Sequence, residues 1–216
     1  MDKLGKILGD FRQLTPDLKT YEVELTPPTR EDNLRCRGVT DMTHTFETMK
    51  RVKGFGETLD SFKVMATPAP EFSMLMVYGG TGNGKSRCCE ALVIALEKRG
   101  IYAVRNRWSD IVRRMKSLFN GRGDMPYEEY FDRLKRAPRL ILDDVGSGST
   151  LGPWEWGELE DIIDYRYERR LFTVLTTNLD IKQFPERILS RFRERSRSRL
   201  ILNEAVDQRP MQGAGK

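Results

Sequence analysis

The sequence contains little histidine and little cysteine, which excludes one common kind of metal site. It has 1 histidine, His44, and 3 cysteines among 216 residues. Cys88 and Cys89 are adjacent and Cys36 stands alone, so the paired spacing of a zinc site is absent. We therefore expect reduced thiols with Cys88 or Cys89 in the core, and we assign no role to His44.

The sequence also lacks any apolar run long enough to cross a membrane, which takes about 18 or more residues. Its first residues, MDKLGKILGDF, do not contain the apolar run of a signal peptide. Charged residues make up 32% and hydrophobic residues 38%, which is polar for a globular chain but not typical of a disordered one. We expect a cytoplasmic protein with no membrane attachment, consisting of one α/β domain and a short appendage.

The excess of positive charge is small, at +5, and it is concentrated near the C-terminus. One short segment contains six arginines: Arg187, Arg191, Arg193, Arg195, Arg197 and Arg199. Such a cluster is compatible with nucleic acid but does not demonstrate it. The last four arginines either form a solvated basic face or contact nucleic-acid phosphates without reading the sequence.

Residues 1–40 differ from the rest of the chain. Apolar residues recur there at helical spacing: Leu4, Ile7, Leu8 and Phe11. This spacing predicts an amphipathic helix over 3–14, whereas two prolines and mixed charge predict a loop over 25–38. The helix either docks on its own domain or binds a partner protein. We predict that 1–40 is a partner-binding helix with a linker.

From residue 41 onward, predicted strands and helices alternate. Apolar runs predict strands over 73–78, 101–104, 139–144, 172–178 and 198–203. Helices are predicted over 42–52, 57–66, 86–100, 109–119 and 153–170, with another beginning near Pro185. This alternation indicates an α/β fold with a five-stranded parallel sheet covered by helices on both faces. The domain would span 41–207, and 208–216 would be a disordered tail.

A glycine-rich segment, YGGTGNGKSR, lies between the first predicted strand and the next helix. Gly79, four residues, Gly84, Lys85 and Ser86 form the pattern of a phosphate-binding P-loop. Glycines let backbone N–H groups converge on a phosphate chain, and the helix N-terminus adds a positive end. Lys85 would reach the β- and γ-phosphates, and the Ser86 hydroxyl would complete a Mg²⁺ shell.

Polar side chains end two later strands. Asp143 and Asp144 follow an apolar strand, where one acid would hold Mg²⁺, directly or through water, and the other would orient or deprotonate the attacking water. Asn178 ends the next strand and would hold that water or sense the γ-phosphate. The alternatives are solvated turn residues at both places.

Arg191 stands in a Ser-Arg-Phe triplet on the helix that begins near Pro185. An arginine that lies away from its own P-loop could complete the site of a neighbouring subunit. Such a residue raises the rate of phosphoryl transfer by about 10³- to 10⁵-fold. The alternative is a basic face in water.

From residue 45 to about Leu202, these motifs resemble the DnaC, DnaI and IstB group of helicase loaders and transposition helpers, within the AAA+ class of ATPases. GGTGNGKS resembles the group's Walker A motif, and RLILDDVG resembles its Walker B motif. Residues 162–180 resemble its helix and sensor-1 strand, and ILSRF resembles its arginine-finger segment. Walker A alone is shared by many families, whereas this order of motifs is more specific.

The resemblance implies a P-loop AAA+ core with ATP and Mg²⁺ as cofactors. It implies nucleotide contacts from the loop residues Gly79, Gly80, Thr81, Gly82, Asn83, Gly84, Lys85, Ser86 and Arg87. It implies Mg²⁺ at Ser86 and Asp143, with catalytic roles for Lys85, for Asp144 on the water, for Asn178 as sensor and for Arg191 in trans. Arg187 is a second candidate for the trans-acting finger, and Arg166 would face the subunit interface.

Two departures from the group matter. Most AAA+ proteins place a glutamate where this chain has Asp144, and the shorter acid predicts slow turnover. The sequence continues for about 14 residues after Leu202, so we expect no C-terminal helical lid and a less enclosed nucleotide. Self-association into a ring or spiral should then matter more.

In this group, loops inside a spiral of subunits contact DNA. The candidates here are Phe119, which otherwise packs in the core, together with Arg122, Ser147 and Ser149. Trp154 and Trp156 are predicted to pack at the start of a helix.

The function expected is an ATP-dependent helicase loader that binds single-stranded DNA, with residues 1–40 gripping a replicative helicase. One alternative is an IstB-like transposition helper acting on duplex DNA, and another is a nucleotide-gated scaffold with little turnover. A small-molecule kinase would leave Asn178 and the Ser-Arg-Phe segment unexplained.

Overall fold

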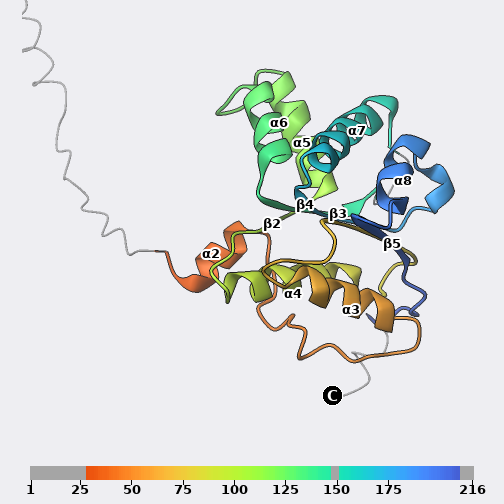
Figure 1. Cartoon of the computed structure of the whole chain (residues 1–216). Coiled ribbons are helices and arrows are strands. Elements are labelled where there is room, and N and C mark those ends of the chain that lie inside the picture. Colours follow the sequence, from red (N-terminus) through yellow and green to blue (C-terminus); the bar gives the residue numbers. More distant parts are fainter. Residues whose placement is uncertain (1–27, 147–150, 210–216) are drawn as a thin grey trace, which may run out of the picture.

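A five-stranded parallel sheet forms the centre of the molecule, as the sequence predicted (Figure 1). The computed structural model describes residues 28–146 and 151–209. The strands are β1 (Met74–Tyr78), β2 (Val104–Arg107), β3 (Arg139–Val145), β4 (Phe172–Thr177) and β5 (Ser198–Leu202). Their order across the sheet is β2-β3-β4-β1-β5, so β1 lies between β4 and β5.

Helices cover both faces of the sheet (Figure 1). On one face lie α2 (Arg30–Cys36), α3 (Gly56–Met65) and α4 (Lys85–Glu97). On the other lie α5 (Trp108–Phe119), α6 (Tyr127–Arg136), α7 (Pro153–Glu168) and α8 (Glu186–Arg193), with the 3₁₀-helix η1 (Ile181–Gln183) ahead of α8. Within the described ranges, none of these helices combines the length and the apolar character that crossing a membrane requires.

Each face of the sheet buries its own apolar cluster because successive side chains of a strand point to opposite faces. In β1, Leu75 and Val77 join the cluster under α3 and α4, whereas Met74 and Met76 join the cluster under α5 to α8. All four are fully buried. A central parallel strand covered on both faces is therefore a continuous apolar run, which is why the sequence predicted it well.

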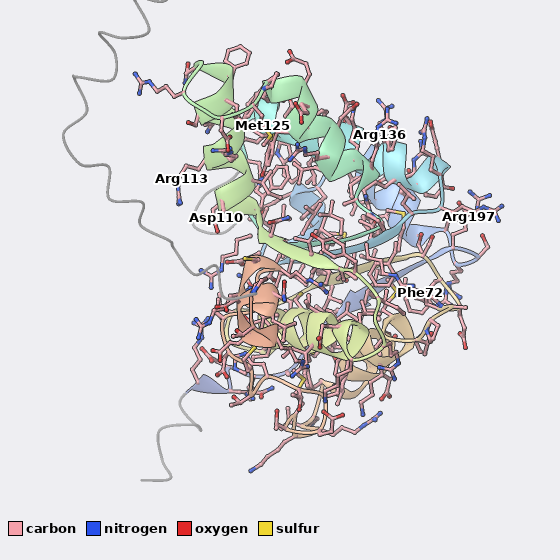
Figure 2. All side chains as sticks on the ribbon, turned by 90° about the vertical axis from the view of Figure 1, so that its left-hand side faces the viewer. Phe72, Asp110, Arg113, Met125, Arg136 and Arg197 are labelled. Carbon is pink, nitrogen blue, oxygen red and sulfur yellow. The ribbon has the colours of Figure 1, made fainter. Side chains whose placement is uncertain are left out.

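The carboxyl ends of the parallel strands meet at one edge of the sheet, and the polar motifs follow these ends. Figure 2 shows the two edges: Asp110, at the start of α5 after β2, lies at one side. Phe72 and Arg197, which precede β1 and β5, lie at the other. The P-loop after β1 and the acids at the end of β3 therefore share one edge.

The helix α2 replaces part of the loop that the sequence predicted over 25–38. The Thr29 hydroxyl accepts a hydrogen bond from the Asp32 backbone N–H, and the Asp32 carboxylate accepts one from the Thr29 N–H. This capping box starts the helix just after the two prolines, which therefore do not interrupt it. Leu34 is buried in the cluster beneath the sheet, so this part of the predicted linker packs on the domain. The role of 1–40 stays a prediction, since 1–27 lie outside the described residues.

The helix predicted over 42–52 is wrong, because this stretch forms turns. Its apolar residues pack against the core at helix-like intervals: Met42, Phe46, Met49 and Val52. The Asp41 carboxylate, however, accepts hydrogen bonds from the Thr43 N–H at 2.8 Å and from its hydroxyl at 2.6 Å. Short polar side chains that bond nearby backbone compete with helix formation, and here they prevail.

Two further elements differ from the prediction. β2 begins at Val104 rather than at residue 101, and its inward-facing residue is Arg105, which ion pairs hold in the interior. α6 was not predicted, because only Phe131 and Leu134 of its ten residues are buried among charged neighbours. In both cases the apolar signal was too weak to reveal the element.

The three cysteines are free. Cys88 and Cys89 are both buried in α4, and burial raises the pKa of both thiols well above the usual value. Cys36 is exposed at the end of α2.

Candidate functional site

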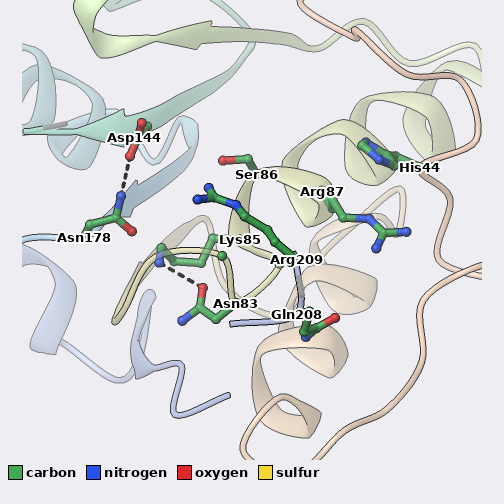
Figure 3. A pocket seen from close by; sticks show the side chains of 11 residues that line it. His44, Asn83, Lys85, Ser86, Arg87, Asp144, Asn178, Gln208 and Arg209 are labelled. Atoms are coloured by element: carbon green, nitrogen blue, oxygen red, sulfur yellow. Dashed lines mark hydrogen bonds between the residues drawn. The ribbon is translucent and has the colours of Figure 1, made fainter. Parts of the chain in front are cut away.

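The glycine-rich segment forms a loop between β1 and α4 (Figure 3). Gly79 has a φ of 141°, and a Cβ there would lie 2.3 Å from the Asn203 carbonyl oxygen, so the loop tolerates no side chain at this point. Gly84 caps α4 with a left-handed φ of 92°. The loop therefore turns sharply into a helix whose first N–H groups lack intrahelical partners, which is a favourable place for an anion.

Lys85 is the first residue of α4 and is only 6% exposed. Its ammonium donates to the carbonyl oxygens of Gly79 at 2.8 Å and Gly80 at 2.6 Å and to the Asn83 side-chain oxygen at 3.0 Å. Burial lowers the pKa of Lys85 to about 8, although the carboxylates of Asp144 and Asp143 oppose this shift. An additional anion close to this ammonium would restore its preference for the charged form.

Asp143 is fully buried behind the loop, at the end of β3. Its Oδ1 accepts hydrogen bonds from the Ser86 hydroxyl at 3.2 Å and from the Thr176 hydroxyl. Its Oδ2 accepts two hydrogen bonds from the Arg105 guanidinium, at 2.9 and 2.6 Å. The structure thus brings Ser86 and Asp143 together, as their predicted shared role requires. It adds Arg105 and Thr176, which the sequence analysis missed.

Asp144 and Asn178 form a second pair at the same edge. The Asn178 side-chain amide donates to the Asp144 Oδ1 at 2.7 Å (Figure 3). The register of β3 against β4 shifts between Leu142 and Val145, and Asp144 takes a left-handed φ of 59°. Such a conformation is uncommon outside glycine, and at a strand end it turns the carboxylate out of the ladder.

Part of the loop, Asp144 and Asn178 line one pocket, whereas the buried Asp143 is not among its lining residues (Figure 3). Its lining comprises His44, residues 82–87, Asp144, Asn178, Gln208 and Arg209. Gly79, Gly80 and Thr81 precede this stretch of the loop. Gln208 and Arg209 belong to the segment predicted as a disordered tail, and the structure instead packs them at the pocket.

His44 connects the pocket to a buried charge network, although the sequence analysis gave it no role. Its Nδ1 lies 2.6 Å from the Glu90 Oε2. Glu90 is 3% exposed and its other oxygen lies 3.2 Å from Arg105, the residue that also pairs with Asp143. A lone histidine in a turn carries no sequence signal for this, because Glu90 and Arg105 approach it only in the folded chain.

Arg191 lies outside the pocket of its own chain. Its Nε donates to Asp164 on α7 at 2.9 Å, and its guanidinium lies 4.7 Å from the centre of the Tyr167 ring. Arg187, the second candidate finger, pairs with the other oxygen of Asp164 at 2.5 Å. The side chain of Arg191 is 32% exposed and that of Arg187 is 62% exposed, so both reach the surface from α8.

Arg166 does not face a subunit interface, contrary to the expectation. It is fully buried, and its guanidinium donates to the Thr173 hydroxyl and to backbone carbonyls of Ala137 and Phe172, among others. Burial lowers the pKa of Arg166 to about 10. This arginine ties α7 to β4 and to the end of α6.

Two of the four candidate DNA contacts lie at the end of the α5–α6 pair. Phe119 is 75% exposed and therefore not a core residue, and Arg122 is exposed beside it. Figure 2 shows Met125 of the same connection at the end of these helices away from the sheet. Ser147 and Ser149 lie outside the described residues.

The two tryptophans differ in burial, and the role of the basic segment stays a prediction. Trp156 packs on Phe184 with ring centres 5.0 Å apart, whereas Trp154 is 38% exposed. In the basic segment, Arg193 pairs with Glu186, and Arg197 lies 3.5 Å from Glu194 at the sheet edge opposite the P-loop (Figure 2).

The chain is similar in sequence to two curated proteins. No family model matches the sequence. The chromosomal replication initiator protein DnaA of Limosilactobacillus fermentum is 22% identical over 77% of this chain and 39% of its own length. A putative insertion sequence ATP-binding protein of Sinorhizobium fredii is 28% identical over 53% of this chain and 43% of its own length. The matches thus span less than half the length of these curated relatives.

Solved structures share the fold. A DnaC helicase loader superposes with a TM-score of 0.63 and 22% identity, covering 76% of this chain and 98% of that one. A replication initiator DnaA bound to AMPPCP and single-stranded DNA also gives 0.63, with 21% identity over 77% of this chain and 51% of that one. The chain therefore shares the fold of these proteins, and the resemblance in fold that the motifs indicated is confirmed.

Proposed function

We propose that this protein is an ATP-dependent helicase loader that binds single-stranded DNA and delivers a replicative helicase. The observation that carries the proposal is a pocket lined by the glycine-rich loop, one acid and an amide, with the second acid buried behind the loop and Arg191 outside the lining. The likeness in fold to a DnaC helicase loader over nearly its whole length supports the partner class.

The pocket suits a nucleoside triphosphate with Mg²⁺. The Ser86 hydroxyl and the Asp143 carboxylate lie 3.2 Å apart and are the oxygen donors that Mg²⁺ prefers. Both Asp143 oxygens are already hydrogen-bonded, so contact through a water molecule fits without displacing Arg105. Mg²⁺, when bound, neutralises charge on the phosphates.

The protein's own groups supply the rest of the hydrolysis site. Lys85 would exchange contacts with the loop carbonyls for the β- and γ-phosphate oxygens, and Asp144 would orient or deprotonate the attacking water. The Asn178 amide holds the Asp144 carboxylate at 2.7 Å and so fixes its direction. Asp144 is shorter than glutamate by one methylene, so we propose slow turnover.

Arg191 completes the site of a neighbouring subunit in a ring or spiral. To test this, Lys85→Ala should abolish nucleotide binding, whereas Arg191→Ala should spare binding and abolish DNA-stimulated hydrolysis. Arg133→Ala, which removes an exposed arginine paired with Glu129 on α6, is the control and should behave as the wild type. Substituting Arg187 in the same way tests the second candidate finger.

A mixing experiment distinguishes action in trans from action within one chain. Lys85→Ala retains Arg191, and Arg191→Ala retains an intact P-loop, so a mixture of the two inactive variants should regain DNA-stimulated hydrolysis. An Arg191→Ala variant that hydrolyses ATP normally by itself contradicts the trans site.

The N-terminal segment would grip the helicase. Deleting residues 1–27 leaves the Thr29 cap of α2 in place, so the variant should fold, bind ATP and fail to capture the helicase. Unchanged helicase capture by this variant would remove the segment from the proposal.

A transposition helper on duplex DNA is the second candidate, favoured by the similarity to an insertion sequence ATP-binding protein. Capture experiments with helicase and with transposase, together with the preference for single or double strands, separate the two. A nucleotide-gated scaffold is favoured by Asp144, and turnover near zero even with DNA would support it.

A further inference from the structure

The segment after β5 folds back over the P-loop. The Asn203 backbone N–H donates to the Tyr78 carbonyl at 2.8 Å, which extends the pairing of β5 with β1. Asn203 and Asn83 then exchange hydrogen bonds, each amide donating to the other residue's carbonyl, at 3.0 and 3.1 Å. Both asparagines are 1% exposed. The loop and the C-terminal segment are therefore joined by buried, reciprocal bonds.

Asp207 and Gln208, which follow in the chain, contact the glycine-rich loop directly. A Cβ at Gly82, whose φ is 71°, would lie 1.8 Å from the Asp207 carboxylate. The Gln208 backbone N–H donates to the Gly82 carbonyl at 3.0 Å, and the Arg209 N–H donates to the Asp207 carboxylate at 2.9 Å. This places the last two described side chains at the pocket rather than in solvent away from it.

The side chains of Gln208 and Arg209 have hydrogen-bond donors that are not satisfied within the described residues. The Gln208 side-chain nitrogen is buried, and among the described residues it has no hydrogen-bond partner. Figure 3 shows the Arg209 side chain extending across the pocket toward Ser86. Its positive charge contributes to the lowered pKa of Lys85, so two cations face the same space.

We propose that the segment 203–209 is a second wall of the nucleotide site, in which Arg209 contacts the phosphate chain and Gln208 donates to a nucleotide oxygen. The inference rests on the proposed triphosphate site. Two cations in one pocket repel each other, and a polyanion between them converts this repulsion into attraction. A guanidinium is suited to this role because its planar fork can donate to two phosphate oxygens at once.

The test measures ATP and ADP binding by calorimetry to the full chain. Arg209→Ala should weaken ATP binding about tenfold or more, as loss of a charge-assisted bidentate contact does, and Arg209→Lys should recover part of it. Gln208→Ala should weaken it less. Arg133→Ala is the matched control, because Arg133 is an exposed arginine paired with Glu129 on α6, away from the pocket, and it should bind as the wild type.

A second measurement does not depend on variants. Hydrogen exchange of the wild-type protein should slow at 203–209 when ATP is added, because the bound nucleotide would hold the segment on the loop. If the wild type binds nucleotide while Arg209→Ala binds equally well and the segment gains no protection, this inference is wrong. If the wild type binds no nucleotide at all, the proposed function itself fails.

Discussion

Arg105 and Asp143 form a buried ion pair behind the glycine-rich loop. Arg105 is 4% exposed and Asp143 is fully buried, so neither charge has water to solvate it. Removing one partner of such a pair leaves the other buried and uncompensated. Arg105 thus positions the carboxylate that the proposed Mg²⁺ site requires, although it does not line the pocket itself.

Arg105→Met should therefore destabilise the protein by about 3–5 kcal/mol, the range for breaking a buried pair. Urea unfolding monitored by circular dichroism measures the change. Arg99→Ala is the control, because Arg99 is an exposed residue just after α4. Its free energy of unfolding should stay within about 0.5 kcal/mol of the wild-type value. A loss no larger than that of the control would mean that Asp143 does not depend on Arg105.

The lowered pKa of Lys85 predicts that the proposed nucleotide binding depends on pH. Its pKa of about 8 in the protein alone means that the ammonium loses its proton as the pH rises through that value. Bound phosphates favour the protonated form, so above about pH 8 binding must take up a proton and affinity should fall, by at most about tenfold per pH unit.

Titration calorimetry at about pH 7.5 and at about pH 9 should show this loss, with proton uptake visible as a dependence on buffer ionisation enthalpy at the higher pH. Lys85→Arg retains a charge that does not titrate in this range and provides the control. Equal affinity of the wild type at both pH values would contradict the assignment.

Individual site residues differ in how far the sequence predicts them. Lys85 and Ser86 stand in one short pattern, and Asp144 and Asn178 end apolar strands, so a parallel sheet brings them together. Their roles stay predictions. Arg105 and the tail residues around Arg209 were missed because their partners come from segments distant in sequence, which only the strand order and the return of the chain after β5 bring together.

Among helices and strands, prediction succeeded where the apolar pattern was strong. β1 is apolar throughout, and β3 contains the apolar run Leu140–Leu142 and β4 the apolar pair Val174–Leu175, because both faces of these strands are covered. Prediction failed over 42–52, where apolar residues at helix-like spacing pack against the core from turns. It also failed at α6, where only two of the ten side chains are buried. The spacing of apolar residues does not show where side chains form local hydrogen bonds with the backbone that compete with helix formation.

α2 should contribute to the stability of the domain, although its sequence suggested a linker. Leu34 is 1% exposed in the cluster beneath the sheet, so Leu34→Ala should destabilise the protein by about 2–5 kcal/mol through the lost contacts and the cavity left behind. Chemical denaturation measures the loss. Arg35→Ala, on the exposed side of the same helix, should change the free energy of unfolding little. If Leu34→Ala has an equally small effect, α2 does not contribute to the stability of the domain.

For the whole molecule, the placement of Arg191 predicts that activity depends on assembly. Arg191 and Arg187 share Asp164 at the surface of α8 and α7, away from the pocket of the same chain. In the proposed assembly, each subunit would supply a phosphate site to itself and its Arg191 to the site of a neighbour. Under this proposal, hydrolysis would depend on contact between neighbouring subunits and would not take place within one chain alone.

The rate of hydrolysis per subunit should therefore rise with protein concentration and level off once neighbours have assembled, instead of staying constant. Steady-state ATPase measurements over about a hundredfold dilution range, with sedimentation at the same concentrations, check whether the plateau coincides with assembly. Added salt should move the plateau to higher concentration, because the exposed charges across the contact are screened. Arg191→Ala should stay near zero throughout. A rate per subunit that is flat on dilution into monomers would place the whole active site within one chain and remove the need for a neighbour's arginine.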